Sequence, residues 1–147
     1  MVDNKYKIFF VEDEPGIADL YCMSFSKNGF LIENFANGTD AKKKLQEYRK
    51  DVSARPDVII LDILLPDVSG MELLREVRSF RDFDSIPVIM LTNYGTDEIK
   101  KEIKKTQGVR HILKIDTSPR LFIKQVKEAL GIKTDPEETK NVSPVVQ

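Results

Sequence analysis

The stretch Val58-Ile59-Ile60-Leu61-Asp62-Ile63-Leu64-Leu65 decides the fold, because every residue in it except one is apolar. A strand with one solvent-facing side alternates apolar and polar residues, and this run has no polar side. Such a run is typical of a parallel strand buried between two layers of helices. The exception, Asp62, is costly to bury without a partner, so we expect it to have a chemical role.

Four further runs rich in β-branched and aromatic residues accompany this stretch. We predict strands at residues 8–11, 31–35, 58–61, 88–91 and 111–113. The segments between and after the strands carry apolar residues at the spacing of amphipathic helices. The apolar helix positions are Ile17, Leu20, Tyr21 and Phe25; Ala41, Leu45, Tyr48 and Val52; Leu73, Leu74, Val77 and Phe80; Ile99 and Ile103; and Phe122, Val126, Ala129 and Leu130. Strands that alternate with helices predict an α/β fold with a parallel sheet.

Boundary residues support these helices. Asn28-Gly29 supplies a left-handed stop for the first helix. Ser118 can cap the last helix with Pro119 at its first position. After Gly131 the chain becomes rich in charges and contains two prolines but almost no large apolar residue. We therefore expect one domain over residues 1–131 and a flexible tail or linker stub over 132–147.

The composition of the 147 residues excludes several classes of function. Lys and Arg total 23 against 24 Asp and Glu, and a net charge of -1 argues against direct nucleic-acid binding and against attraction to anionic lipid. The longest apolar stretch is too short to span a bilayer and the N-terminus lacks a signal-peptide apolar region, so we expect a cytoplasmic protein. The lone Cys22 excludes an internal disulfide and the two-cysteine redox and zinc motifs.

Polar residues follow the predicted strands at their carboxyl ends, where open α/β sheets bind ligands. Glu12, Asp13 and Glu14 follow the first strand, Asp62 the third, Thr92 and Asn93 the fourth, and Lys114 the fifth. If the strand order is the flavodoxin-like 2-1-3-4-5, the first and third strands are neighbours and their carboxylates lie together. The residues would then form a combined site for a metal ion and an anion.

The residue types suggest what this site does. Clustered carboxylates repel one another unless a cation is present, and Mg²⁺ prefers such oxygen ligands, so Asp13 and Asp62 are the expected direct ligands. With no Ser, Cys or His poised nearby, Asp62 itself is the candidate nucleophile toward phosphorus. Lys114 would neutralise one phosphoryl oxygen and the Thr92 hydroxyl would donate a hydrogen bond to another. Taken singly, Asp62 also fits a loop carboxylate, Thr92 a helix cap and Lys114 a solvated lysine. Their combination favours a functional site.

From about residue 5 to residue 130 the chain resembles the receiver domain of bacterial response regulators. The similarity is carried by residues 10–15, 56–71, 87–92 and 111–114. The resemblance implies a doubly wound, flavodoxin-like (βα)5 fold whose five parallel strands have the order 2-1-3-4-5. It also implies that a sensor histidine kinase, a histidine phosphotransfer protein or a small acyl phosphate phosphorylates Asp62, with Mg²⁺ as cofactor.

The same resemblance assigns roles to individual residues. Glu12 would hold the metal mainly through water, and Leu64 would offer its backbone carbonyl. Thr92 and His111 would be switch residues, and the surface of the fourth helix, fifth strand and fifth helix would repack to bind an unknown downstream protein. The chain would be a stand-alone signalling protein that catalyses only its own phosphorylation and dephosphorylation, and a phosphorylation-dependent homodimer is compatible with this role.

Some residues depart from the family pattern. Ile115 stands where a proline in a cis peptide is usual, and a non-proline cis bond costs about 3 kcal/mol, which favours a trans bond and a different presentation of the preceding lysine. His111 replaces the usual Tyr or Phe and is either a switch or a plain surface histidine. Asn93 would narrow access for the phosphodonor. Leu64 and Tyr94 add apolar bulk on the path of attacking water, which predicts slow autodephosphorylation.

Other functions remain as alternatives. A dehalogenase-like phosphohydrolase needs a second Asp two residues after Asp62, where this chain has Leu64. A flavodoxin-like electron carrier would want a Ser/Thr/Gly-rich phosphate loop, and residues 12–14 would repel a phosphate instead. A phosphorelay intermediate and a scaffold receiver that is never phosphorylated also fit the sequence.

Two groups of lysines are prominent. Lys42, Lys43 and Lys44 indicate a solvated helix face. Lys100, Lys101, Lys104 and Lys105 form a basic strip on the face that the family uses for partners. This strip is either another solvated face or a contact for an acidic docking helix.

Overall fold

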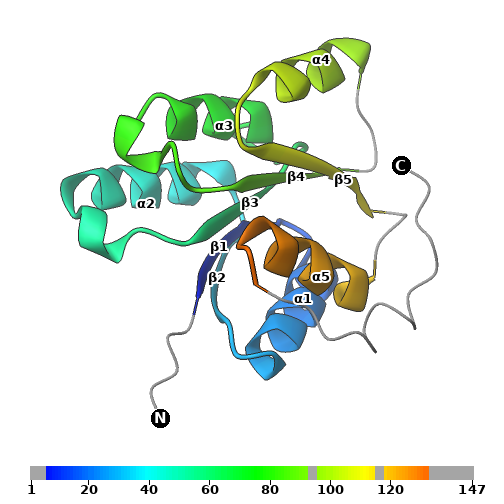
Figure 1. The fold of residues 1–147 in the computed structure, drawn as a ribbon. Coiled ribbons are helices and arrows are strands. Elements are labelled where there is room, and N and C mark those ends of the chain that lie inside the picture. The colour runs from blue at the N-terminus through cyan, green and yellow to red at the C-terminus, as the bar shows by residue number, and fades with distance from the viewer. Residues whose placement is uncertain (1–5, 93–95, 115–117, 133–147) are drawn as a thin grey trace.

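The computed structural model describes residues 6–92, 96–114 and 118–132. Its strands are β1 (Lys7–Val11), β2 (Leu31–Phe35), β3 (Val58–Asp62), β4 (Val88–Thr92) and β5 (Val109–Leu113). Its helices are α1 (Pro15–Lys27), α2 (Gly38–Lys50), α3 (Gly70–Arg78), α4 (Asp97–Lys105) and α5 (Pro119–Ala129), with short 3₁₀ turns η1 (Val52–Ala54) and η2 (Arg81–Phe83). The strands form one parallel sheet in the order β2-β1-β3-β4-β5, which confirms the predicted α/β fold and strand order (Figure 1).

Two hydrophobic cores lie on opposite faces of this sheet. Along β1, Phe9 and Val11 join the core under α2, α3 and α4, whereas Ile8 and Phe10 join the core under α1 and α5 (Figure 1). Every residue of β3 and β4 is buried, as expected for parallel strands between two helix layers. The outer strands β2 and β5 are more exposed because each is covered less completely at an edge of the sheet.

The predicted helix ends are confirmed where capping chemistry specified them. The Ser118 side chain accepts a hydrogen bond from the backbone N–H of Leu121, and Pro119 begins α5. Gly29 after α1 and Gly131 after α5 adopt φ angles of 85° and 74°, in the left-handed region that favours glycine. These residues stop the two helices that cover the same face of the sheet.

Three predicted helix positions differ from the structure. Leu20 is 50% exposed, because α1 turns Tyr21 and Phe25 toward the sheet and Leu20 lies about 100° around the helix from Tyr21. Val52 belongs to η1, and Phe80 lies between α3 and η2, although Phe80 is buried as predicted. The apolar spacing continues past both helix ends because a 3₁₀ turn also returns the chain to the same side after three residues.

Several predictions concern residues outside the described ranges. They include Asn93, Tyr94 and Ile115, and almost all of the expected tail, from residue 133 onward. Within the described ranges, no helix combines the length and the apolar character that crossing a membrane requires.

Candidate functional site

The buried polar side chains lie together at the carboxyl edge of the sheet. Among the described residues, the buried polar and charged ones are Glu12, Asp62 and Thr92, with exposures of 1%, 3% and 1%. Asp62 ends β3, Thr92 ends β4 and Glu12 directly follows β1, so all three lie at the same end of parallel strands. A fold that buries two carboxylates side by side needs a compensating charge.

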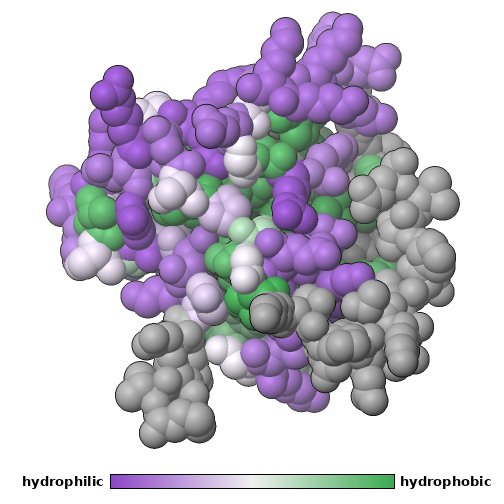
Figure 2. Space-filling model, in the orientation of Figure 1, coloured by the Kyte–Doolittle hydropathy of each residue, from purple (hydrophilic) through white to green (hydrophobic). Residues whose placement is uncertain are grey.

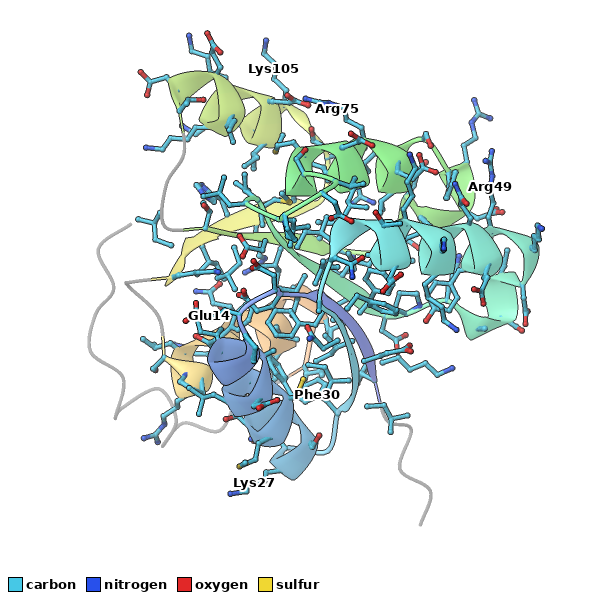
Figure 3. The ribbon with its side chains drawn as sticks, turned by 180° about the vertical axis from the view of Figure 1, so that it is seen from behind. Glu14, Lys27, Phe30, Arg49, Arg75 and Lys105 are labelled. Atoms are coloured by element: carbon cyan, nitrogen blue, oxygen red, sulfur yellow. The ribbon has the colours of Figure 1, made fainter. Side chains whose placement is uncertain are left out.

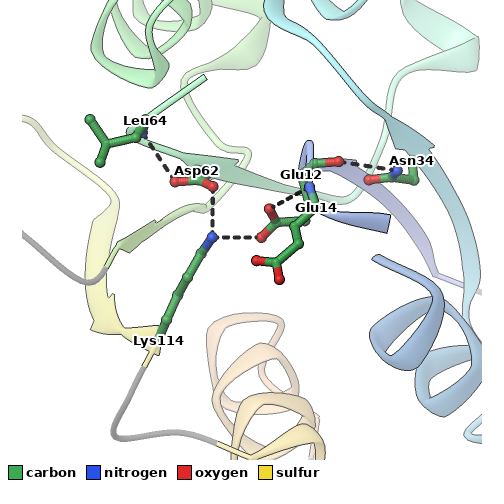
Figure 4. Close-up of polar contacts among 6 residues, drawn as sticks. All are labelled: Glu12, Glu14, Asn34, Asp62, Leu64 and Lys114. Carbon is green, nitrogen blue, oxygen red and sulfur yellow. Dashed lines mark hydrogen bonds and ion pairs between the residues drawn. The ribbon is translucent and has the colours of Figure 1, made fainter. Parts of the chain in front are cut away.

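Lys114 supplies that charge from the end of β5. Its Nζ lies 2.7 Å from Oδ2 of Asp62 and 2.8 Å from Oε1 of Glu12 (Figure 4). The lysine side chain is only 15% exposed, so solvent screens these contacts little. One ammonium therefore links the carboxylates that follow β1 and β3.

Backbone N–H groups hold the other oxygen of each carboxylate. The N–H of Leu64 donates to Oδ1 of Asp62 at 3.1 Å, and the N–H of Glu14 donates to Oε2 of Glu12 at 3.1 Å (Figure 4). The side-chain amide of Asn34 donates to the backbone carbonyl of Glu12 at 3.4 Å. Both carboxylates are thus oriented by one lysine and one backbone amide each.

Burial and charge shift the ionisation of this group. Burial raises the pKa of Glu12, and the charge of Asp62 raises it further, while the contacts with Lys114 and Glu14 oppose the rise. Burial alone would lower the pKa of Lys114, but its hydrogen bonds and charge interactions with Asp62 and Glu12 outweigh burial and raise it. Lys114 therefore stays protonated. A second cation beside Glu12 would favour the ionised form of this carboxyl group.

The arrangement fits a hard divalent cation. Glu12, Asp13 and Asp62 each offer an oxygen, and these three oxygens lie within 4.8 Å of one another. With Lys114, the ionised groups carry three negative charges and one positive charge, a formal sum of -2 that one divalent ion cancels. An all-oxygen set with an exposed member, Asp13, matches the preference of Mg²⁺ for carboxylates and retained water.

The loop after β3 is fixed by contacts that the sequence analysis missed. The carboxylate of Asp67 accepts hydrogen bonds from the backbone N–H of Gly38 at 2.8 Å, from that of Thr39 at 3.0 Å and from the Thr39 hydroxyl. These contacts, the hydroxyl first, lower the pKa of Asp67. A Cβ at Gly70 would lie 2.1 Å from the backbone carbonyl oxygen of Asp62, so only glycine fits there. No local sequence signal links Asp67 to partners almost thirty residues away.

His111 occupies a different place from the carboxylate cluster. It lies in the middle of β5 opposite Met90, and its side chain is partly buried. Its Nε2 is buried with no hydrogen-bond partner among the described residues. Burial, together with the charge of Lys100 on α4, lowers the pKa of His111. The predicted site residues Glu12, Asp62 and Lys114 are in contact, whereas His111 lies toward α4.

Comparison with known proteins agrees with this geometry. The family model described as "Response regulator receiver domain" matches residues 8–126. The chain is 33% identical over 116 residues to the phosphate regulon transcriptional regulatory protein PhoB of Rhizobium meliloti, covering 79% of this chain and 48% of that protein. It is 34% identical over 123 residues to the transcriptional regulatory protein CreB of Escherichia coli, covering 84% and 50%. The chain thus spans about half the length of these relatives.

A solved structure shows the same fold. The chemotaxis response regulator CheY4 of Vibrio cholerae superposes with a TM-score of 0.74 at 28% identity, covering 86% of this chain and 100% of that one. The matched residues 8–126 run from β1 into α5 and include Glu12, Asp62 and Lys114. The chain therefore belongs to the response regulator receiver domain family.

Proposed function

We propose that this receiver domain accepts a phosphoryl group on Asp62 from the phosphohistidine of a sensor kinase or of a histidine phosphotransfer protein. The observation that carries the proposal is the setting of the Asp62 carboxylate. It is 3% exposed, lies 2.7 Å from the Lys114 ammonium and sits within a cluster of three carboxylates suited to a divalent ion. A carboxylate held beside a lysine, at a place suited to a divalent ion, is suited to attack a phosphoryl group, because both cations would offset the charge on the phosphoryl oxygens.

The transfer exchanges one bond to phosphorus for another. An oxygen of Asp62 forms a bond to phosphorus while the phosphorus–nitrogen bond of the donor histidine breaks. The electron pair of that bond leaves on the imidazole nitrogen, which then takes up a proton. With a small acyl phosphate as donor, the phosphorus–oxygen bond breaks instead and the donor leaves as a carboxylate.

Several residues of the chain have separate roles in this phosphoryl transfer. Lys114 already contacts Asp62, and its ammonium would pair with an oxygen of the incoming phosphoryl group. Mg²⁺, when bound, supplies positive charge that offsets the charge on the phosphoryl oxygens. Asp13 and Asp62 would hold it directly, Glu12 through water, and Leu64 through its backbone carbonyl. Deprotonated carboxylates are needed for this, and Lys114 favours that form.

The signal would leave the site through Thr92 and the α4–β5–α5 surface. Thr92 ends β4, the strand between β3 and β5: it follows Leu91, which pairs with Asp62, and it pairs with Leu113, which precedes Lys114. A phosphoryl dianion on Asp62 adds strong acceptor oxygens, which favours a conformation in which Thr92 donates to one of them. The output would then be altered affinity for a downstream protein, for a second copy of the chain, or for the next member of a phosphorelay.

This role makes the chain a signalling protein whose only catalysis is its own phosphorylation and dephosphorylation. We place it in the cytoplasm, where the ATP that supplies histidine kinases is found. A hydrolase with a second catalytic carboxylate is disfavoured, because the side chain two residues after Asp62 is the apolar and 62% exposed Leu64.

The test is direct. The protein is incubated with acetyl phosphate and Mg²⁺ and then weighed by intact mass spectrometry. We expect the wild type to gain the mass of one phosphoryl group, and Asp62→Asn and a sample in excess EDTA to gain none. Asp19→Asn, which removes an exposed carboxylate of α1, is the matched control and should behave as the wild type. A wild type that gains no mass with acetyl phosphate or with phosphorylated histidine donors would instead be a phosphorylation-independent scaffold.

A further inference from the structure

The β3–α3 loop, residues 63–69, connects Asp62 to α3 and is held at both of its ends. The N–H of Ile63 donates to the carbonyl of Leu91 on β4 at 3.2 Å, and the N–H of Gly70 donates to the carbonyl of Ile63 at 3.0 Å. The first residue of α3 therefore lies beside the end of β3, and the residues between them form a closed loop.

The middle of this loop has little apolar packing. Four of its residues are exposed: Leu64, Pro66, Asp67 and Ser69. The surface over the helices α3 and α4 is mostly hydrophilic as well (Figure 2). An exposed segment with few buried contacts opens at low free-energy cost. Polar contacts therefore decide whether the β3–α3 loop keeps one conformation.

These polar contacts come from the N-terminus of α2. Helices α2 and α3 lie side by side on one face of the sheet, as the views from the front and from behind both show (Figure 1, Figure 3). Oδ1 of Asp67 accepts a hydrogen bond from the N–H of Gly38, and Oδ2 accepts from the N–H and the hydroxyl of Thr39. A Cβ at Gly38 would overlap with the carbonyl oxygen of Val68, so the two backbones are in direct contact. The three hydrogen bonds of Asp67 are called the Asp67 clasp below.

The Asp67 clasp is not needed to begin α2. This helix has its own N-cap, Asn37, whose side chain accepts a hydrogen bond from the N–H of Asp40 at 2.8 Å. Asp67 accepts from the N–H groups of the two residues between them, at the positive end of the helix dipole. The clasp therefore fixes the loop on a helix that is already capped.

The loop carries backbone groups that the site uses. The N–H of Leu64 donates to Oδ1 of Asp62, and the carbonyl of Leu64 is the backbone ligand in the proposed metal site (Figure 4). Leu64 lies two residues after Asp62 and three before Asp67, between two residues that are held in place. A ligand group that is already ordered binds more tightly, because binding does not have to order it.

We propose that Asp67 is a positioning residue for the phosphorylation site. By holding the β3–α3 loop on α2, it sets the backbone of Leu64 in place for Mg²⁺ and for phosphoryl transfer to Asp62. It acts through Leu64 and touches neither the ion nor the phosphoryl group. This inference rests on the proposed function, because it concerns the same site.

Asp67→Asn tests the proposal. An asparagine presents an NH₂ group where the carboxylate has its second acceptor oxygen, so the clasp loses at least one hydrogen bond. Isothermal titration calorimetry should show a Kd for Mg²⁺ about tenfold higher than in the wild type. At saturating Mg²⁺ the rate of phosphorylation by acetyl phosphate should return close to the wild-type rate, because the bound ion then holds Leu64 in place.

The matched control lies at the other end of β3. Asp57 precedes Asp62 by as many residues as Asp67 follows it, is also exposed, and accepts a hydrogen bond from the backbone N–H of Lys7 at 2.7 Å. Asp57→Asn makes the same chemical change and should leave the Kd for Mg²⁺ unchanged. A lower affinity caused only by a less stable fold would appear in both variants.

Thr39→Val removes the hydroxyl of the clasp and keeps the shape of the side chain. It should weaken Mg²⁺ binding less than Asp67→Asn does. In the double variant the two losses should not add, because both changes act through one set of contacts. Fully additive losses would show that Thr39 and Asp67 act separately and would contradict a shared clasp.

Hydrogen exchange provides a readout that needs neither metal nor phosphoryl group. In EDTA, a peptide containing residues 63–70 should exchange faster in Asp67→Asn than in the wild type, whereas a peptide from β4 should exchange at the wild-type rate. An unchanged Kd for Mg²⁺ together with unchanged loop exchange would reduce the clasp to an additional helix cap and overturn the inference. An equal loss of affinity in Asp57→Asn would overturn it as well.

The same samples separate this inference from the proposed function. A wild type that binds no Mg²⁺ and gains no phosphoryl group would refute both. A wild type that does both, beside an Asp67→Asn variant with the same Kd and the same loop exchange, would refute only the role of Asp67.

Discussion

At the scale of single residues, Leu64 is placed to control how long a phosphoryl group lasts. Its N–H donates a hydrogen bond to Asp62 and the residue is 62% exposed, so an apolar residue next to Asp62 faces solvent. Leu64→Asn should accelerate loss of the phosphoryl group by roughly tenfold, because an amide can orient an attacking water molecule. The loss is followed by intact mass after the donor is removed.

The control for this prediction is Met23→Asn, which changes a similarly exposed apolar residue on α1. It should leave the rate as in the wild type. A wild-type half-life of only seconds, with no change in Leu64→Asn, would show that apolar bulk at this position does not protect the acyl phosphate.

Lys114 is the residue whose loss should cost the most stability at the site. Lys114→Met keeps much of the volume but leaves the carboxylates of Glu12 and Asp62 buried without a cation, which should destabilise the fold by about 3 kcal/mol. Urea unfolding at neutral pH measures this cost. Lys124→Met on α5 is a matched control and should have little effect. A cost in Lys114→Met no larger than in the control would mean that solvent already compensates both carboxylates.

The same variant should respond to pH through Glu12. The pKa of the Glu12 carboxyl in the folded protein lies above its ordinary value of 4.5. The stability that this carboxyl contributes is therefore fully present below pH 4.5, and it is lost as the pH rises through the pKa of the folded state. Without Lys114 the folded pKa should rise further. The deficit of Lys114→Met relative to wild type should therefore shrink when unfolding is measured at about pH 5 instead of pH 7. A deficit that grows on acidification would contradict this assignment.

At the scale of elements, Arg78 connects the end of α3 to two neighbouring segments. Its guanidinium donates to the backbone carbonyls of Phe83 at 2.9 Å, Ile86 at 2.8 Å, Gln107 at 3.0 Å and Gly108 at 3.2 Å. Phe83 and Ile86 precede β4, and Gln107 and Gly108 precede β5. One side chain therefore holds the backbone just before both strands. A lysine carries one ammonium group and lacks the planar guanidinium, so it cannot donate to all four carbonyls.

Arg78→Lys should therefore destabilise the protein by about 2 kcal/mol, because several carbonyl groups lose their donor. Arg81→Lys, an exposed position three residues later, should cost almost nothing. Both values come from chemical unfolding followed by circular dichroism. If the two variants are equally stable, the carbonyls find other donors and Arg78 does not hold the elements together.

The elements also differ in how firmly they are held. All residues of β3 and β4 are buried, whereas α4 buries only Ile103 among its described residues. An element with few buried contacts opens and shifts at low free-energy cost. The site is therefore built on rigid strands, and among the helices that the structure describes α4 is the one most able to respond to a change there.

At the scale of the whole molecule, the sequence predicts the fold because its signals are local and agree with one another. The apolar run ending in Asp62, the strand-helix alternation and the Ser118-Pro119 cap each depend on neighbouring residues. The polar residues at strand ends can be grouped because parallel strands bring their carboxyl ends to one edge. The contact between Glu12 and Lys114 is partly predictable, because both residues follow parallel strands of one sheet.

What the sequence does not predict depends on long-range packing. Asp67 and Arg78 appear as ordinary surface charges until α2, α3 and the start of β5 are assembled around them. The two lysine groups look alike in sequence, whereas in the structure Lys42 of α2 lies beside Glu72 of α3, and Glu102 of α4 pairs with Arg75 of α3. Such pairings follow from how helices are positioned, which periodicity does not encode.

The last prediction concerns the global stability of the fold and its dependence on the metal. The three site carboxylates and Lys114 sum to a formal charge of -2 when all are ionised, so the folded protein carries repulsion that the unfolded chain largely escapes. A divalent ion that binds only the folded state stabilises it by mass action, by about 2.7 kcal/mol at a free concentration of 100 times Kd. Thermal unfolding should therefore shift upward in Mg²⁺ relative to EDTA at matched ionic strength. Asp13→Asn should lose most of this shift while remaining folded, because Asp13 is exposed and removing its charge also reduces repulsion. A shift of equal size in Asp13→Asn would mean that Mg²⁺ acts elsewhere on the molecule.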